Sequence, residues 1–255
     1  MNSLVKPKKY LGQHFLTDNS IAKKTANLVI NSHSKNILEI GPGKGILTKQ
    51  LINIKEKEIY AIEIDNESVE FLEYNEIIKK PYLINGDFLK LNLNKTFNEN
   101  FIIIGNFPYN ISSQIIFKML EYRDKIDFMA GMFQKEVAQR IVSKPNNKTY
   151  GILSVLVQAF YDAKIEFKVN PGSFFPPPKV DSAVISCKRK VNFKLNCDEI
   201  LFFDIVKTSF NQRRKTLLNS LSKYNLKKID PLPDILKLRP ENLTVDDFVE
   251  LVNLI

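Results

Sequence analysis

The stretch NILEIGPGKG, residues 36–45, is the clearest indication of how this chain folds. Its first half is a short apolar run of the kind that forms a buried β-strand, and glycines follow at 41, 43 and 45. Glycine lets the backbone turn sharply and approach a ligand closely. The next residues, ILTKQLINI, have apolar side chains at helical spacing. The stretch therefore predicts a strand, a glycine turn, and a helix whose free N–H groups can bind an anion.

The spacing of these glycines narrows the choice of ligand. G-x-G-x-G differs from the dinucleotide pattern G-x-G-x-x-G, and Lys44 is followed by Gly45 and Ile46 where a Walker loop needs Ser or Thr. Binding of a pyrophosphate is therefore disfavoured. Gly41 and Gly43 remain candidate cofactor contacts, and the alternative is a glycine turn that only lets strand and helix pack.

Short apolar runs and helix-like stretches alternate through the first half of the chain. The predicted strands are 36–41, 58–64, 81–86, 101–106 and 126–133. Helical spacing appears between them, and Ser112 and Ser113 are candidate caps of one such helix. The alternation predicts an α/β fold: a parallel, doubly wound, Rossmann-like sheet with helices on both faces and ligands at the carboxyl ends of its strands.

The pattern changes in the last quarter of the chain. Residues 197–210, 211–226 and 241–255 read as three helices with no strand between them. We therefore expect two domains, a catalytic α/β domain over 1–192 and a small all-α domain over 193–255.

Composition limits the class of protein. At 255 residues with 44% hydrophobic content, the chain can bury a sizeable core. No stretch has the length and apolarity of a membrane span or a signal peptide, so a soluble, cytoplasmic protein is expected. Cys187 and Cys197 are too few and too far apart for a zinc ribbon, so we expect inert thiols and no metal. The formal charge of +9 favours a nucleic acid or an anionic membrane face as partner.

Polar side chains end three consecutive predicted strands. Glu63, Asp87 and Asn106 close the second, third and fourth runs, and an acidic side chain at the position of Glu63 can accept both hydroxyls of a ribose. Each residue alone is more often a turn residue or a helix cap. Together they predict an acidic crevice suited to S-adenosylmethionine, which carries a sulfonium, a ribose, an adenine and a carboxylate.

The stretch IIIGNFPYNIS, residues 102–112, suggests which atom receives the methyl group. Asn106 offers a side-chain carbonyl, Pro108 fixes the backbone so that a main-chain carbonyl can point inward, and Tyr109 offers a flat face. Two acceptors on the hydrogens of an exocyclic amine would localise its lone pair toward a methyl donor, and Tyr109 would stack the base. The alternative, a strand that ends in an Asn turn, explains the proline but leaves Asn106 unaccounted for.

The chain resembles a known family over nearly its whole length. NFPY is similar to the N/D-x-P-Y motif of amino-group methyltransferases. The segments KKYLGQHFL, GNFPYNIS, FQKEVAQRI, YGILSVLVQ, FFPPPKVDSAVI and FNQRRKTLLNSL occur in the order seen in bacterial small-subunit ribosomal RNA adenine N6,N6-dimethyltransferases, the kasugamycin-resistance type. The resemblance implies a class I S-adenosylmethionine methyltransferase that dimethylates two adjacent adenosines in the 3′-terminal stem-loop of 16S rRNA. It also implies a monomer whose partner is a small-subunit particle and whose role lies in ribosome biogenesis.

The resemblance also implies roles for particular residues. Many members have Asn at the position of His14 and Leu at that of Phe107. Phe174 matches a second aromatic that sandwiches the target base opposite Tyr109, and Pro108 belongs to the catalytic motif. The implied cofactor positions are Gln13, His14, Leu16, Gly41, Gly43, Glu63, Ile64, Asp87, Phe88 and Asn106.

Clustered charge supports an RNA partner. Arg213, Arg214 and Lys215 begin a predicted helix whose leucines can face the core, which would leave the cations outward for phosphate contacts. The charged KVNFK and NLKK stretches are interpreted as solvated faces. A methyltransferase must also take its target base out of the stack, and a looped-out adenine fits that requirement.

Three other readings stay open at this point. The first is a 23S rRNA adenine dimethyltransferase of the macrolide-resistance type. The second is a ribosome-assembly factor that acts mainly by binding. The third is a nucleotide-dependent oxidoreductase, which the Asn-x-Pro-Tyr segment does not support.

Overall fold

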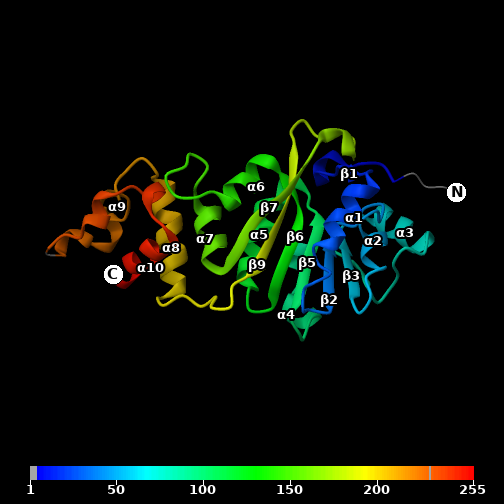
Figure 1. Cartoon of the computed structure of the whole chain (residues 1–255), viewed down its shortest axis with the longest axis horizontal. Coiled ribbons are helices and arrows are strands. Elements are labelled where there is room, and N and C mark those ends of the chain that lie inside the picture. Colours follow the sequence, from blue (N-terminus) through cyan, green and yellow to red (C-terminus); the bar gives the residue numbers. More distant parts are fainter. Residues whose placement is uncertain (1–4, 230) are drawn as a thin grey trace. The chain divides into compact units, whose positions relative to one another are not determined.

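A computed structural model describes residues 5–229 and 231–255. Its main feature is a seven-stranded sheet with the order β4-β3-β2-β5-β6-β9-β7 (Figure 1). The strands in chain order are β2 (Asn36–Ile40), β3 (Glu58–Glu63), β4 (Leu83–Asn85), β5 (Phe101–Asn106), β6 (Ile126–Gln134), β7 (Tyr161–Val169) and β9 (Ser182–Arg189).

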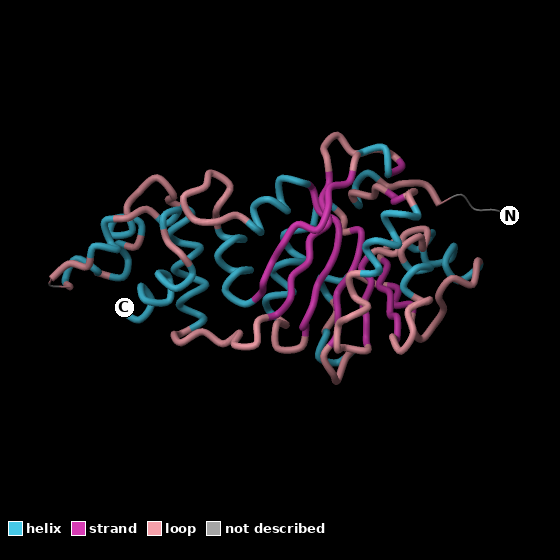
Figure 2. The backbone as a smooth tube through the Cα atoms, viewed as in Figure 1, coloured by secondary structure: helices cyan, strands magenta, loops and turns pink. Residues whose placement is uncertain are grey.

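The predicted strands form the parallel part of this sheet. β2 pairs with β3 and β5, β3 pairs with β4, and β5 pairs with β6, all in parallel. β7 and β9 were not predicted, and β9 runs antiparallel to β6, so the complete sheet is mixed. Figure 2 shows these strands side by side with helices around them.

Both faces of the central strands are buried, as an α/β sheet requires. Ile37 and Ile102 belong to one hydrophobic cluster together with residues of the helices on that side, α1 (Asn19–Asn27), α2 (Thr48–Leu51) and α3 (Asn66–Tyr74). The opposite-facing Leu38 and Ile103 are also fully buried. This burial explains why the strands read as continuous apolar runs rather than as alternating ones.

The helix after β5 is α5 (Ser112–Glu121), and its cap differs from the prediction. Its N-cap residue is Ile111, which makes no side-chain capping bond. Ser112 is instead the first helical residue, and its hydroxyl donates to the carbonyl oxygen of Tyr109 at 3.1 Å. The serine therefore stabilises the turn that carries Tyr109 rather than capping the helix.

A second, two-stranded sheet joins two segments that are far apart in the sequence. β1 (Phe15–Leu16) pairs antiparallel with β8 (Phe174–Phe175). The N-terminal segment is thereby fixed beside the loop that precedes β9.

The chain forms two compact units whose boundaries differ from the predicted division at 192 and 193. The first unit runs to Ala138 and includes Lys164–Arg189, and the second contains Gln139–Ala163 and Lys190–Ile255. The second unit therefore gains α7 (Ile152–Phe160), because Phe160 stacks on Phe203 with ring centroids 5.9 Å apart. The remaining helices of the fold are α4 (Leu93–Thr96), α6 (Lys135–Val142), α8 (Glu199–Asn211), α9 (Leu217–Ser220) and α10 (Val245–Asn253).

The second of the three predicted C-terminal helices is much shorter than expected. Residues 212–215 form turns, and α9 covers only Leu217–Ser220. α8 and α10 agree with the predicted segments, each starting at a side-chain cap, Asp198 for α8 and Thr244 for α10.

Candidate active site

A cavity of about 680 Å³ opens at the carboxyl ends of β2, β3, β4 and β5. It brings together eleven of the predicted site residues: Gln13, His14, Gly41, Gly43, Glu63, Ile64, Asp87, Phe88, Asn106, Pro108 and Tyr109. Parallel strands present their C-terminal ends at one edge, which is why residues far apart in the chain meet here.

The glycine turn forms one wall of this cavity. Gly41, Gly43 and Gly45 have φ angles of +69°, +56° and +75°, which L side chains rarely adopt. A Cβ at Gly43 would also lie 2.8 Å from the ring of Phe15. The backbone N–H of Gly43 donates to Glu63 at 3.0 Å, so the turn is tied to the tip of the next strand. The helix expected directly after the turn begins only at Thr48.

Glu63 is the buried acid of the cavity. Only 4% of its surface is exposed, and its two carboxylate oxygens accept the N–H groups of Gly43 and Asp65, both at 3.0 Å. Burial raises the pKa of Glu63, and these backbone bonds partly offset the rise. The hydroxyls of a ribose bound here would therefore donate to the lone pairs of the Glu63 carboxylate that the backbone N–H groups do not use.

Glu39 is a second buried acid, which the sequence did not single out as a site residue. It lies on β2 just before the glycine turn, with 1% of its surface exposed. Burial, reinforced by the negative charge of Glu63, raises the pKa of Glu39 to about 8. Among the described residues, none forms a hydrogen bond with its Oε2 atom.

Asp87 lies on the far wall of the cavity, at the end of β4. Its Oδ1 atom accepts the N–H of Leu89 at 2.9 Å and caps a single 3-10 turn, Phe88–Lys90. Asp87 thus serves both as the cap that its sequence position suggested and as part of the cavity lining.

Asn106 occupies the tip of β5, and its orientation is fixed from outside the strand. Its Nδ2 atom donates to the backbone carbonyl of His14 at 2.8 Å. This bond uses one of the two amide N–H groups and fixes the orientation of the carboxamide, whose carbonyl Oδ1 can accept from a ligand. The N-terminal segment therefore sets which end of the carboxamide is available for chemistry.

The residue after Asn106 has a packing role. Phe107 is 1% exposed and contacts Phe133, with ring centroids 4.9 Å apart. Gly105 and Gly131 stand opposite each other on β5 and β6, and a Cβ at Gly131 would lie 2.3 Å from the ring of Phe107. Because these two glycines have no side chain, they leave enough space for the Phe107 ring at a position where many members of the resembled family have the smaller Leu.

Tyr109 is held on two sides. Its hydroxyl is hydrogen bonded to that of Ser182 on β9, and its ring lies 5.4 Å from that of His14 at an interplanar angle of 30°. Burial raises the pKa of Tyr109, so the phenol is neutral at physiological pH. The ring is thus a fixed, uncharged surface. Pro108, beside it, accepts the N–H of Ile111 at 3.2 Å through its carbonyl oxygen.

A second cavity, of about 930 Å³, adjoins the first. The two share Gly12, Gln13, His14 and Tyr109. Among the residues that the structure describes, the first is lined by the carboxylates of Glu63 and Asp87 and by no lysine or arginine, whereas the second is lined by lysines and by no carboxylate. The other residues that line the second cavity are Pro7, Lys9, Gln134, Pro176, Pro177, Pro178, Lys179 and Val180.

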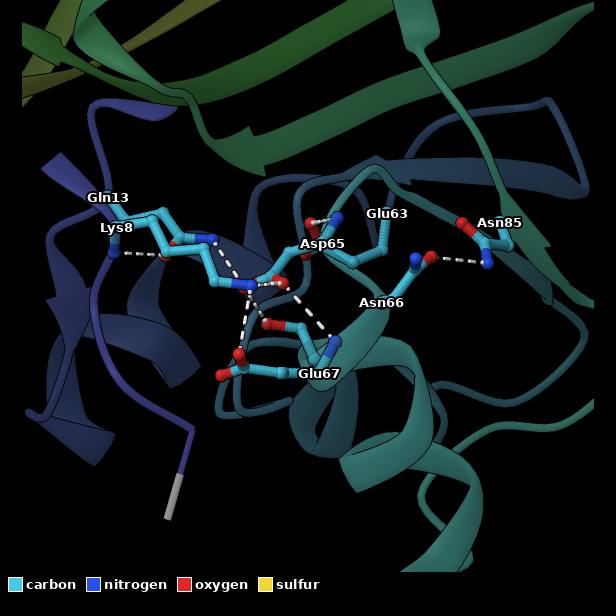
Figure 3. A network of polar contacts seen from close by, with 8 residues as sticks. Lys8, Gln13, Glu63, Asp65, Asn66, Glu67 and Asn85 are labelled. Atoms are coloured by element: carbon cyan, nitrogen blue, oxygen red, sulfur yellow. Dashed lines mark hydrogen bonds and ion pairs between the residues drawn. The ribbon is translucent and has the colours of Figure 1, made fainter. Parts of the chain in front are cut away.

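A polar network attaches the N-terminal segment to the tip of β3 (Figure 3). Lys8 forms ion pairs with the buried Asp65, at 2.5 Å, and with Glu67, at 3.2 Å. Gln13 donates to Asp65 at 3.0 Å and accepts the N–H of Lys8 at 2.8 Å. Asp65 also caps α3, so one carboxylate starts a helix and anchors the segment that carries His14. Lys8 and Asp65 were not among the predicted site residues, although an Asp before a predicted helix is itself a cap signal.

Two predicted site residues lie elsewhere. Leu16 and Phe174 are paired across β1 and β8 and belong to one hydrophobic cluster with Met132 and Val184. Phe174 is 4% exposed and lines neither cavity, so it offers no open face for a base. The structure therefore does not place Phe174 opposite Tyr109 around an open space for a base, as was expected. The pairing of β8 with β1 turns the Phe174 side chain into the core. Its neighbour Phe175 is 58% exposed.

The three predicted RNA-binding cations divide into two kinds. Arg213 forms an ion pair with Glu241 at 2.5 Å and donates to the carbonyls of Lys148, at 2.8 Å, and Asn147, at 3.2 Å. This arginine therefore stabilises the second unit and does not point freely outward. Arg214 and Lys215 are exposed.

The described residues offer little for other chemistries. In 5–229 and 231–255, no group of three or more His, Cys, Asp or Glu side chains could hold a metal ion. No helix in the same ranges has the length and apolarity to cross a membrane. Burial raises the pKa of both Cys187 and Cys197, which makes these thiols poor nucleophiles.

Comparison with known proteins identifies the family. The chain is 54% identical to the ribosomal RNA small subunit methyltransferase A of Flavobacterium johnsoniae over 97% of this chain and 95% of that one. It is 53% identical to the protein of the same name from Phocaeicola vulgatus, over 98% and 90%.

Two solved structures have a similar fold. A dimethyladenosine transferase from Plasmodium falciparum has a TM-score of 0.78 and 26% identity over 93% of this chain and 96% of its own. The 23S rRNA methyltransferase ErmE has a TM-score of 0.66 and 23% identity over 94% and 99%, which shows the fold alone. The family described as ribosomal RNA adenine dimethylase matches residues 5–255. The resemblance seen in the sequence is thus confirmed, and the chain belongs to the ribosomal RNA adenine dimethylase family.

Proposed function

We propose that this chain transfers methyl groups from S-adenosylmethionine to the N6 atoms of two adjacent adenosines in the 3′-terminal stem-loop of 16S rRNA, two on each. The observation that carries the proposal is the carboxamide of Asn106, which is anchored to His14 and lines the same acidic cavity as Tyr109. The proposed enzyme is a cytoplasmic monomer whose partner is a small-subunit particle and which takes part in ribosome biogenesis.

The charge of the first cavity fits the cofactor. Glu63 and Asp87 face a space lined by no lysine or arginine, which suits a sulfonium and a ribose. A dinucleotide is disfavoured because the glycine spacing departs from G-x-G-x-x-G and the helix after the turn begins only at Thr48, which argues against the oxidoreductase alternative. When bound, S-adenosylmethionine supplies an electrophilic methyl group. The glycine turn, Ile64 and Phe88 would hold the rest of the molecule.

Asn106 would position the nucleophile. Its Oδ1 atom accepts one hydrogen of the adenine amine, and a main-chain carbonyl of the Asn106–Pro108 segment accepts the other, which localises the nitrogen lone pair toward the methyl carbon. The new N–C bond forms as the S–C bond breaks, and the proton then leaves the nitrogen for solvent. Alignment of this kind can supply roughly 7–11 kcal/mol of the barrier.

Tyr109 would hold the base. Its neutral ring is fixed by Ser182 and His14 and borders both cavities. The target adenosine would therefore enter through the second cavity, where Lys9 and Lys179 can face its phosphates, and stack on Tyr109. Leu16 and Phe174 would support this arrangement from the core, and Arg214 and Lys215 would contact RNA elsewhere.

The proposed RNA follows from the relatives. Proteins about half identical over nearly the full chain are named small subunit methyltransferases, whereas the 23S rRNA methyltransferase shares only 23% identity. The small subunit methyltransferases are therefore the better guide to the RNA that this chain methylates.

Mapping of the methylated positions tests the proposal. Purified protein and S-adenosylmethionine would be incubated separately with unmethylated small-subunit particles and with 23S rRNA, and the products digested and analysed by mass spectrometry. We expect dimethyladenosine at two neighbouring positions of the 16S rRNA only. Dimethylation of the 23S rRNA alone would support the macrolide-resistance type instead. If the RNA stays unmodified in both samples while the protein still binds the particles, the result would support an assembly factor that acts mainly by binding.

A further inference from the structure

Lys118 is a buried cation that the reaction outlined above does not use. It lies on α5, the helix that begins three residues after Tyr109, and only 7% of its surface is exposed. Burying an ammonium group is costly unless its donors are satisfied. Burial lowers the pKa of Lys118, with the charges of Glu121 and Asp87 acting in the opposite direction.

All three donors of this ammonium group go to one short segment. Its Nζ atom donates to the carbonyl oxygens of Phe88 at 2.6 Å, Leu89 at 2.9 Å and Leu91 at 2.6 Å. A lysine ammonium has three N–H bonds, so these contacts use its full capacity. The Nζ atom also lies 5.0 Å from the centre of the Phe88 ring.

The segment held by Lys118 is a wall of the first cavity. It is the 3-10 turn that Asp87 caps, and Asp87 and Phe88 both line the cavity. The turn is therefore fixed at two points: Asp87 holds the N–H of Leu89 at its start, and Lys118 holds the carbonyls that follow.

We propose that Lys118 is a positioning residue for the cofactor, which holds the Asp87–Phe88 wall at the correct distance from the tip of β5. α5 continues directly from the segment that carries Asn106 and Tyr109, so one helix fixes both the acceptor side and the cofactor side of the reaction. This inference rests on the proposed function for the identity of the cofactor. The role is indirect, because Lys118 lines neither cavity.

Lys57 provides a matched control. It too is a lysine whose pKa is lowered by burial, and its Nζ atom donates to the carbonyls of Ser32 at 2.6 Å and Ser34 at 2.7 Å. It directly precedes β3, at the end of that strand away from the first cavity, and does not line that cavity. A general loss of buried lysine–carbonyl bonds would therefore affect both sites, whereas cofactor positioning belongs to Lys118 alone.

The test compares Lys118→Met with Lys57→Met. Methionine has a similar length and no donor. We expect Lys118→Met to raise the calorimetric Kd for S-adenosylmethionine by about tenfold or more, and to change kcat at saturating cofactor by less than about threefold. Lys57→Met should lower the melting temperature and leave the cofactor Kd unchanged.

Two results would overturn the inference: a folded Lys118→Met variant with the wild-type Kd, or an equal loss of cofactor affinity in Lys57→Met. If Lys118→Met does not fold, Lys118→Arg carries the test. A planar guanidinium keeps the charge but cannot direct three donors to three converging carbonyls, so its Kd should also rise, and a wild-type Kd would again overturn the inference. The calorimetry needs no RNA, so its result is distinguishable from failure of the proposed rRNA methylation.

Discussion

At the scale of single residues, the site depends on side chains whose orientation is set by their neighbours. Asn106 gives its amide N–H to His14, and Tyr109 bonds through its hydroxyl to Ser182. Each partner occupies the polar atom that the proposed chemistry does not need. The carbonyl of Asn106 and the ring face of Tyr109 are thereby left for the base that we propose they bind.

This division of roles predicts different effects for two substitutions of Tyr109. Tyr109→Ala removes the stacking surface, worth about 1–3 kcal/mol per base, and should raise KM for the RNA or lower kcat/KM accordingly. Tyr109→Phe removes only the hydrogen bond to Ser182 and should cost about 0.5–1.5 kcal/mol. Steady-state kinetics on small-subunit particles separate the two. Equal losses in both variants would show that the hydroxyl, not the ring, matters.

A pH dependence follows from Glu39. Its pKa of about 8 in the folded protein lies above the ordinary value of 4.5, so between these pH values the folded state holds a proton that the unfolded chain releases. Stability must then fall as pH rises through that range.

Glu39→Gln removes this proton linkage. Relative to wild type, the variant should gain on the order of 3–4 kcal/mol of unfolding free energy between pH 5 and pH 8, since each pKa unit is worth about 1.4 kcal/mol. Urea denaturation at several pH values measures it. Parallel stability curves for the two proteins would contradict the assignment. Some slope should remain in the variant, because burial also raises the pKa of Glu63.

Several site residues were predictable from the sequence because strand ends are readable. Glu63, Asp87 and Asn106 each follow an apolar run, and parallel strands bring such ends together. Phe174 shows the limit of this reasoning. Its position in a motif could be recognised, but its burial depends on the pairing of β8 with β1, two-residue strands that have no periodicity to detect.

At the scale of elements, the N-terminal segment is a structural part of the first cavity, the proposed cofactor site. Residues 11–15 line it, and the Lys8–Asp65 ion pair attaches that segment to the start of α3. Burial alone would raise the pKa of Asp65, but the bonds from Lys8 and Gln13 outweigh it and lower that pKa. The attachment is therefore complete at neutral pH and is lost as pH falls through the lowered pKa of Asp65.

Lys8→Met should weaken cofactor binding several-fold, because it leaves the buried Asp65 without its cation and releases the segment that supplies Gln13 and His14. Calorimetry with S-adenosylmethionine measures the effect. Lys79→Met is the matched control: it breaks an exposed ion pair with Glu76, of a kind that contributes only about 0–1 kcal/mol. A cofactor affinity equal to wild type in Lys8→Met would contradict a structural role for the segment.

The elements themselves were unevenly predictable. β2 to β6 were predicted because each is a compact apolar run next to a turn. β7 and β9 were not: β7 mixes charged with apolar residues at the edge of the sheet, and β9 follows a proline-rich loop. The helix expected over 211–226 is interrupted where Arg213 turns to Glu241, a long-range contact that local propensity does not contain.

At the scale of the whole molecule, the cations behind the formal charge of +9 do not all have the same role. Part of it is consumed inside the protein: Lys118 and Arg213 bind backbone carbonyls, and Lys8 binds Asp65. Exposed cations such as Arg214 and Lys215 are the ones left for phosphate contacts. Net charge alone could suggest a nucleic-acid partner, but it could not show which cations serve it.

Arg213 and Arg214 offer a direct comparison of these uses. Arg213→Ala should lower the melting temperature, since it removes the ion pair with Glu241 and two hydrogen bonds to carbonyls. Arg214→Ala should leave the melting temperature unchanged, weaken RNA binding and reduce the slope of log K against log salt by about 1. Binding titrations over a range of salt concentrations measure the slope. An unchanged slope in Arg214→Ala would remove it from the RNA-binding surface.

In the proposed reaction, the Asn106 carboxamide holds the adenine amine in line with the methyl donor. Single-turnover methyl transfer by Asn106→Ala, saturated with S-adenosylmethionine and mixed with unmethylated small-subunit particles, tests it most directly. We expect the rate to fall by about a hundredfold or more, as when one preorganised hydrogen-bond partner of a reacting group is removed. The cofactor Kd should change much less than the rate, and saturation with S-adenosylmethionine removes that smaller effect from the comparison. A rate within a few-fold of wild type would contradict the account.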